Sequence, residues 1–573
     1  MKFGVTSLSF LCVLCASVVP CFSLDREAFT FTNYDLNLQI EPDQQRLGVR
    51  GKITLRNDSQ TPQKIAVLQI TSSLDWRSIK AGDKALQFVS QPYTSDIDHT
   101  GALSEAIVTL PQMVAPKGTV ELEIGYEGVV VLDATRLTRI GTPEAAANSS
   151  DWDQISTKFT AVRGVGYVAW YPIATEVADL SDGNNLFEVL GRWKGREAAS
   201  GMHLQLSLAR ESTEPPPGIL INQPTCHAIA AEPSRPQHVS IDCAYQTLAF
   251  SVPTFVIADY QLVGRPAIEV SYLRGHDASA ESYADAAEKV APFISEWFGV
   301  LREKARTADL ADPDAAPFES GSLLLMPLAS TDPKLAGLIA AHQLAHASFS
   351  SPRPWIEEGL AHFAQAIYLE HEKGRQAAHD YMGLHRSAFS DAEKPTTAPR
   401  SEDEVNRALV NTSIEELYRS KAMYVWWMLR DMIGEQAFKK VLAAYRPEQD
   451  KDPSYMPKLI AAQTQRDLEW FFDDWVYHDR GLPDFKVESA FSRKPADAYM
   501  LTITVDNLGA VGAEVPVTVK FAGGEITKRL EVRGKNKGVI RVEVPGAPQE
   551  VVVNDGSVPE SDMTNNTFKI EGK

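Results

Sequence analysis

The chain has 573 residues, of which 44% are hydrophobic and 23% are charged, so it is long enough to form several domains with substantial cores. Its formal net charge is −19 at pH 7. This acidic balance disfavours nucleic acid and anionic membrane surfaces as partners, because both carry negative charge themselves. Beyond the N-terminal region, no stretch is long and apolar enough to predict a membrane-spanning helix.

Residues 1–23 have the pattern of a signal peptide. Lys2 supplies the positive start, an apolar run follows over residues 5–19, and Ser23 closes a small-residue cleavage site. Pro20, directly before Cys21, does not suit a lipoprotein processing site. We therefore expect an extracytoplasmic protein, periplasmic or secreted, that has no membrane span once the signal peptide is removed.

Residues 24–266 predict an N-terminal antiparallel β-domain. Short segments of alternating polar and apolar residues, such as 35–40 and 120–126, are separated by turn signals. The two cysteines outside the signal peptide, Cys226 and Cys243, fall within this domain. In an oxidising compartment we expect them to form a disulfide that braces a hairpin, rather than to remain as two free thiols.

The pattern becomes helical after residue 266 and returns to strands after residue 483. Helices are predicted over residues 278–305, 335–349, 355–373 and 414–433, with two more ending near residue 477 and one strand over residues 323–326. Alternating strands over residues 484–573 predict a small immunoglobulin-like β-sandwich.

Two histidines mark the candidate metal site. His342 and His346 lie four residues apart, on one face of the helix predicted over residues 335–349, and can share one metal ion. Zinc in hydrolytic sites takes three protein ligands and leaves a fourth position for water. Glu358, in the first turn of the next predicted helix, is the candidate third ligand. The alternative is that both histidines are structural residues of a core.

The segment around Glu358 carries a family resemblance. Residues 355–361, Trp-Ile-Glu-Glu-Gly-Leu-Ala, resemble the W-L-x-E-G-[LF]-A segment of the gluzincin metallopeptidases related to aminopeptidase N. The resemblance implies that Glu358 is the third zinc ligand beside His342 and His346. Residues 418–422, Tyr-Arg-Ser-Lys-Ala, resemble the family's Tyr-x-Lys-Gly helix with one residue inserted. The implied fold places a thermolysin-like, mainly helical metallopeptidase domain at residues 267–483.

Gln343 is the main departure from the family pattern. It stands where the family has the glutamate of H-E-x-x-H, which takes a proton from the attacking water. An amide can hold that water by a hydrogen bond but cannot accept its proton, and general-base help contributes typically ~10²–10⁴-fold in rate. We therefore expect peptide hydrolysis to be weak or lost.

Two further departures concern the substrate and the third ligand. The strand that should carry the Gly-x-Met-Glu-Asn motif is Phe-Glu-Ser-Gly-Ser-Leu-Leu-Leu-Met-Pro over residues 318–327, so we expect it to provide no glutamate that clamps a substrate α-amine. This argues against a true aminopeptidase. The spacing from His346 to Glu358 is also shorter than in aminopeptidase N, which requires a tighter loop.

Other residues are candidates for parts of the chemistry. Glu357 points about a hundred degrees away from Glu358 around a helix, so it is a poor base. His362 lies four residues after Glu358, and the alternatives for it are an additional metal ligand, a hydrogen-bond partner of a ligand, a weak base or a structural histidine. Tyr418 is a candidate oxyanion stabiliser by resemblance, with Tyr424 as its competitor, and core packing is an alternative for both.

These patterns together predict an exported zinc-binding metallopeptidase homologue that engages a peptide or protein ligand. Gln343 occupies the position of a degenerate general base. One rival hypothesis is an active zinc-dependent peptidase that uses another base. The other is a non-catalytic binding or scaffold protein in which zinc is structural or absent.

Overall fold

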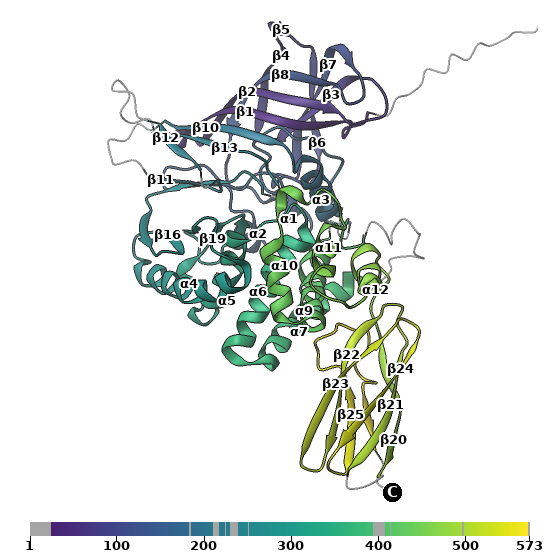
Figure 1. Ribbon diagram of the computed structural model, residues 1–573. Helices are drawn as coiled ribbons and strands as arrows, with labels where there is room; N and C mark the ends of the chain where they lie inside the picture. Colours follow the sequence, from purple (N-terminus) through teal and green to yellow (C-terminus); the bar gives the residue numbers. More distant parts are fainter. Residues whose placement is uncertain are drawn as a thin grey trace, which may run out of the picture.

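The computed structural model describes residues 24–182, 185–209, 217–223, 225–229, 239–249, 251–392, 407–412, 414–494 and 498–570. The predicted signal peptide lies outside these residues. N-terminal β-sheets, a mainly helical middle region and a C-terminal pair of sheets follow one another along the molecule (Figure 1). This mixed, multidomain architecture confirms the predicted fold class at that level. None of the described helices has both the length and the apolar character needed to cross a membrane.

The N-terminal region is built on an eight-stranded sheet with the order β12-β13-β10-β1-β2-β8-β4-β5. Its strands are β1 (Phe29–Glu41), β2 (Arg46–Asn57), β4 (Leu74–Ala81), β5 (Lys84–Ala85), β8 (Thr119–Val129), β10 (Gly201–Leu208), β12 (His227–Ile229) and β13 (Val239–Tyr245). Alternate residues of β1, including Leu36 and Leu38, are buried, as expected for a sheet with one face on a core. The predicted disulfide between Cys226 and Cys243 is present and joins the β12 end to β13.

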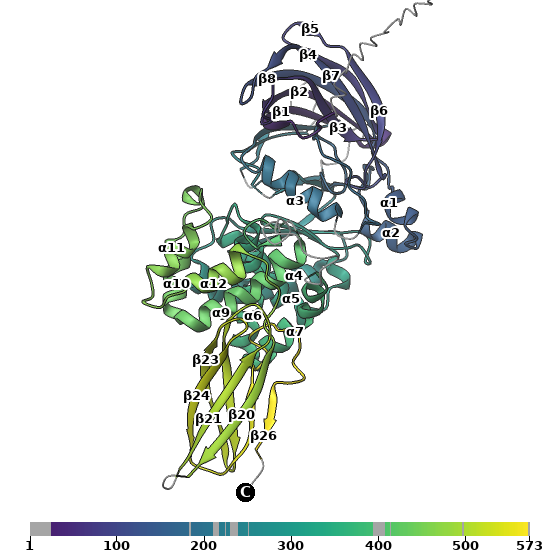
Figure 2. The ribbon, with the colours of Figure 1, turned by 90° about the vertical axis from the view of Figure 1, so that its right-hand side faces the viewer.

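One strand pair departs from the predicted antiparallel sheet. β1 and β10 run parallel, with Leu36 opposite Leu204. Parallel neighbours need a crossover connection, and here it comprises all the elements between β1 and β10 and ends with α3 (Asn185–Glu197). Figure 2 shows α3 between the N-terminal sheets and the helical region. The crossover therefore carries side chains towards the middle region.

Two small sheets and two short helices complete the N-terminal region. Their elements are β3 (Gln63–Thr71), β6 (Phe88–Thr94), β7 (Ala102–Val114), α1 (Thr135–Arg139), α2 (Glu144–Ser150), β9 (Phe159–Val162), β11 (Gly218–Ile221) and β14 (Phe255–Ala258). β9, β11 and β14 form a sheet of their own beside the middle region.

The middle region begins with a five-stranded sheet in the order β15-β16-β17-β19-β18. Its strands are β15 (Gln261–Gly264), β16 (Ile268–Tyr272), β17 (Ala305–Asp309), β18 (Phe318–Ser320) and β19 (Leu323–Met326). The sheet starts before residue 266, because β15 pairs with β16. β16, β17 and β19 are parallel, whereas β18 is an antiparallel edge strand. The sequence predicted β19, and the resemblance placed residues 318–322 in the same strand, whereas they form the separate strand β18 and the turn after it.

Helices make up the rest of the middle region and pack against this sheet and one another (Figure 2). They are α4 (Asp277–Phe298), α5 (Pro333–Ser348), α6 (Pro354–Lys373), α7 (Arg375–Ala392), α9 (Ala422–Ile433), α10 (Glu435–Ala444), α11 (Tyr455–Ala461) and α12 (Glu469–Phe472). A π-helical turn, η3 (Leu417–Lys421), precedes α9 where one uninterrupted helix was predicted. A second such turn, η5 (Asp473–Tyr477), follows α12. The core beneath α9 includes the fully buried side chains of Trp426 and Trp427.

The C-terminal region consists of two facing sheets. One has the order β20-β21-β24 and the other β23-β22-β25-β26. The strands are β20 (Phe485–Arg493), β21 (Tyr499–Asn507), β22 (Ala513–Phe521), β23 (Gly524–Val532), β24 (Lys537–Val544), β25 (Pro548–Val553) and β26 (Thr567–Lys569). Valine side chains such as Val505, Val517 and Val542 are buried between them. The immunoglobulin-like classification of this region stays a prediction.

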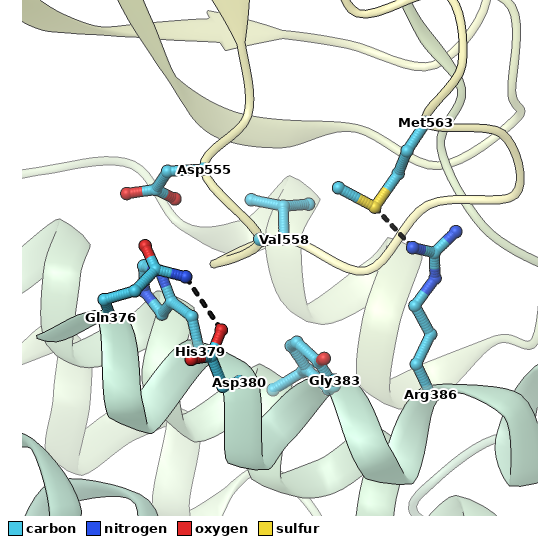
Figure 3. A pocket seen from close by; sticks show the side chains of 10 residues that line it. Gln376, His379, Asp380, Gly383, Arg386, Asp555, Val558 and Met563 are labelled. Atoms are coloured by element: carbon cyan, nitrogen blue, oxygen red, sulfur yellow. Dashed lines mark hydrogen bonds between the residues drawn. The ribbon is translucent and has the colours of Figure 1, made fainter.

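An open cavity of about 370 Å³ lies between the C-terminal region and α7. Figure 3 shows His379 and Arg386 on the helix, facing Asp555 and Met563 from the C-terminal region across this space. None of the histidines and glutamates of the candidate metal site lines it. The cavity therefore belongs to the junction between two regions.

Candidate metal centre

Helix α5 presents the two predicted histidine ligands side by side. The helix begins at Pro333, and Asp332 caps it by accepting a hydrogen bond of 2.9 Å from the Lys334 backbone N–H. The Nε2 atoms of His342 and His346 lie 3.2 Å apart. Two nitrogens bound to one tetrahedral zinc ion at about 2.0–2.1 Å would lie about 3.3 Å apart. The pair is therefore spaced as two ligands of one cation.

Glu358 reaches the same place from the first turn of α6. Its Oε1 lies 3.9 Å from His346 Nε2, and its Oε2 accepts a hydrogen bond of 3.0 Å from Arg419 Nε. The predicted tight loop is residues 349–353, between the end of α5 and the start of α6. The structure thus brings His342, His346 and Glu358 together, and Arg419 of η3 holds the carboxylate from the other side.

The tight crossing of α6 and α9 explains why glycine follows Glu358. A Cβ at Gly359 would lie 2.6 Å from the Ala422 Cβ and 2.9 Å from Trp426 Nε1. Trp426 also stacks on Trp355, with ring centroids 4.8 Å apart, and donates a hydrogen bond to the Trp355 carbonyl oxygen. This close approach brings the start of α9, and η3 before it, over the Glu358 turn.

Glu357 has a role that sequence reasoning missed. Its Oε1 lies 3.2 Å from Nδ1 of His346, and its Oε2 accepts a hydrogen bond from the Ser351 backbone N–H. A histidine that ligates through Nε2 commonly donates its Nδ1–H to such a carboxylate, which fixes the tautomer and the ring orientation. Glu357 therefore positions His346. The sequence feature that could have indicated this role is the position of Glu357 directly before Glu358, in the first turn of α6 after the loop.

Glu319 is the second residue that was missed. We expected no glutamate from its strand in this cleft, yet its Oε2 lies 2.9 Å from His342 Nε2. Glu319, His342 and His346 form one group of donor atoms within 4.8 Å of one another, and His342, Glu358 and His362 form another. The prediction overlooked Glu319 because it rested on the motif comparison alone, whereas in the structure β18 is a separate edge strand, whose alternation turns this side chain towards α5.

Three more residues surround the cluster. The His362 ring centroid lies 4.8 Å from that of His342. Tyr418, on η3, lies within electrostatic range of Glu358, and burial followed by that carboxylate raises the pKa of the phenol. Lys194, half-buried on α3, also lies within electrostatic range of Glu358 and Arg419. Burial lowers the pKa of Lys194 to about 8, against the opposing effect of Glu358. Tyr424 lines the cavity beside α7 instead.

Gln343 is fully buried, and its amide is bound into the core. Its Oε1 accepts hydrogen bonds from the hydroxyls of Tyr283, at 2.7 Å, and Thr307, at 3.2 Å. Its Nε2 donates to the carbonyl oxygens of Arg306, at 2.8 Å, and Ser322, at 3.3 Å. Both acceptor sites and both donor hydrogens of the amide are thus used. None of them is left to hold a water at the histidines.

Opposite charges within the cluster shift the pKa values of its members. Burial lowers the pKa of His346, but Glu319, Glu357 and Glu358 outweigh burial and raise it to about 10. Burial also opposes ionisation of Glu358, but Arg419 and the two histidines outweigh it and lower the pKa of that carboxyl. In the described part of the chain, His342 Nδ1 and Glu319 Oε1 are buried without a hydrogen-bond partner. Imidazole and carboxylate donors in this arrangement fit a zinc ion.

Comparisons with known proteins add one likeness. No family model and no curated protein matches the sequence. Among solved structures, the chain is similar to a mutant of an M1 zinc metallopeptidase from Deinococcus radiodurans, at 14% sequence identity and a TM-score of 0.47. The alignment covers 78% of this chain and 94% of that chain.

Proposed function

We propose that this protein is an exported, zinc-binding homologue of gluzincin metallopeptidases whose hydrolytic activity is weak or lost. One observation carries the proposal. Donor atoms of His342, His346 and Glu358 converge beside an amide, Gln343, that is bound into the core where an active site needs a base. The exported location is supported by the sequence of residues 1–23 alone.

Bound zinc would act as a Lewis acid and lower the pKa of coordinated water. Around it, the side chains of this protein have separate roles. Glu357 orients His346, and Arg419 holds one oxygen of Glu358. Tyr418, beside Glu358, is the proposed donor to a developing oxyanion. Since Gln343 cannot accept a proton, these groups are better suited to binding a peptide or protein ligand than to cleaving it.

An active peptidase is the rival hypothesis, and the site contains two candidate bases for it. Lys194 lies within electrostatic range of Glu358 with a pKa near 8, which is suitable for a general base. His362 lies against His342 and is neutral, because burial, His342 and Arg419 lower its pKa. Hydrolysis by the native protein that is lost in Lys194→Met or His362→Gln would favour this rival.

The test measures zinc content and cleavage of a mixed peptide library in the native protein, His342→Ala and His371→Ala. His371 is the matched control, because it is an exposed histidine on α6. We expect about one zinc per chain in the native protein and in the control, no zinc in His342→Ala, and background cleavage in all three. Zinc retained by His342→Ala would exclude this site. Zinc-dependent cleavage by the native protein would refute the loss of activity.

A further inference from the structure

Glu319 is the carboxylate that lies closest to the histidine pair. Its Oε2 is 2.9 Å from His342 Nε2, whereas the nearer oxygen of Glu358 is 3.9 Å from His346 Nε2. We propose that Glu319 is itself a ligand of the metal ion, so that four protein side chains, His342, His346, Glu358 and Glu319, fill the coordination positions. This inference rests on the proposed function, since it requires a cation between the two histidines.

The hairpin that carries Glu319 fixes the direction of its side chain. β18 and β19 pair antiparallel, with Glu319 opposite Leu324 and Ser320 opposite Leu323. The connection is a tight turn at residues 321 and 322, and Gly321 adopts a φ of 59°, which favours glycine. Because side chains alternate along a strand, Glu319 points to the opposite face from its two neighbours. That face carries the histidines of α5.

Both neighbours of Glu319 are anchored in the N-terminal region. The Phe318 ring meets that of Tyr167 edge to face, with centroids 5.4 Å apart. The Ser320 hydroxyl accepts a hydrogen bond of 2.7 Å from Asn222 Nδ2 and donates one of 3.1 Å to the Val252 carbonyl oxygen. Glu319 is therefore held at His342 by contacts on each side, as expected for a preorganised ligand.

The other oxygen of Glu319 supports a ligand role. Glu319 Oε1 is buried and has no hydrogen-bond partner in the described part of the chain. Arg419 already occupies Oε2 of Glu358, so Glu358 can offer a metal one unpaired oxygen. Zinc sites closed by four protein donors are structural, whereas catalytic sites keep one position for water. A ligating Glu319 would take that position and would block hydrolysis independently of Gln343.

The test uses cobalt(II), whose visible absorption reports coordination, and zinc affinity measured by competition with a chromogenic chelator. The variants are Glu319→Ala, Glu319→Gln and His342→Ala. Glu269→Ala is the matched control, because Glu269 lies on the same sheet, at the surface, in an ion pair with Lys304. Azide is added to each cobalt protein, because it binds a coordination position that no protein ligand fills. Circular dichroism confirms folding.

We expect the native protein and Glu269→Ala to keep their cobalt spectrum in azide. Glu319→Ala should bind zinc at least about tenfold more weakly and should respond to azide. Glu319→Gln should also bind zinc more weakly, which covers the case in which Glu319→Ala does not fold. An azide response of the native protein, or native zinc affinity in both Glu319 variants, would overturn the closed site. Native zinc affinity in His342→Ala would instead refute the proposed function.

Discussion

The Tyr283 hydroxyl donates a hydrogen bond of 2.7 Å to Oε1 of Gln343, so that α4 is joined to α5 beside the metal cluster. Together with the bonds from the same amide to Thr307 and to two carbonyl oxygens of the sheet region, this contact makes Gln343 a structural link. An amide suits the position because it both accepts and donates. A carboxylate would accept only.

Gln343→Glu should therefore destabilise the protein without creating a peptidase. The new carboxyl group would face the carbonyl oxygens of Arg306 and Ser322, which now receive N–H donors. We expect the free energy of unfolding in urea to fall by about 2–3 kcal/mol at pH 7, because a buried acceptor pair is left unsatisfied. Gln87→Glu, at an exposed position, is the control and should change it by less than about 0.5 kcal/mol. A stable Gln343→Glu protein that cleaves peptides would contradict this interpretation of Gln343.

Glu357→Gln should weaken zinc binding without unfolding the protein. The carboxylate lies 3.2 Å from His346 Nδ1, and loss of a carboxylate that orients a metal-ligating histidine typically costs about 10–100-fold in metal affinity. Chelator competition measures the change. Glu372→Gln, near the end of the same helix, removes a carboxylate far from the cluster and should leave the affinity unchanged. Equal affinities in the two variants would show that His346 does not depend on Glu357.

Gly359→Ala tests the crossing of α6 and α9. The added methyl group would lie 2.6 Å from the Ala422 Cβ, so the helices must separate. We expect a loss of about 1–3 kcal/mol in stability, measured by urea unfolding of the metal-free protein. Gly383→Ala is the control, because a Cβ there meets no heavy atom within 4 Å, and alanine should stabilise its helix by up to about 1 kcal/mol. Equal free energies of unfolding for the two variants would mean that α6 and α9 can move apart without loss of stability.

The parts of the site that depend on helical periodicity were predictable from the sequence. His342 and His346 share a face because they lie four residues apart, and Glu358 returns to them because the loop between the helices is short. The inserted residue in the Tyr418 segment was visible as well. A single extra residue in a helix is commonly accommodated by a π-helical turn, and η3 is such a turn.

The rest of the site depends on contacts between segments far apart in the chain. Glu319 reaches His342 only because β18 pairs with β19 and is anchored by Tyr167 and Asn222. Lys194 lies on α3, the last element before β10, which is the strand that pairs parallel with β1. No local sequence pattern predicts that Glu319 lies beside His342 or that Lys194 lies near Glu358. The orientation of the Gln343 amide is likewise determined by hydroxyls and carbonyl oxygens of distant elements.

The end of α3 provides a test of pH dependence away from the metal. Glu197 is 1% exposed, and burial raises the pKa of its carboxyl from 4.5 to about 7, against the opposing effects of Arg196 and of the hydrogen bonds that it accepts. Between these pH values the folded protein retains a proton that the unfolded chain has released. The stability that this proton contributes is therefore complete below pH 4.5 and is lost as the pH rises through 7.

Glu197→Gln should remove this dependence. The neutral amide keeps an acceptor for the Phe31 backbone N–H and can donate to the Ser200 hydroxyl. We expect the variant to be more stable than the native protein above pH 7 by up to about 3 kcal/mol, and the difference to vanish near pH 4. Urea unfolding across this range, with metal removed, measures both curves. Asp83→Asn, in the exposed turn between β4 and β5, is the control for removing one negative charge. A constant offset between the native protein and Glu197→Gln at every pH would show that the carboxyl of Glu197 has the same pKa in the folded and unfolded states, and would contradict the prediction.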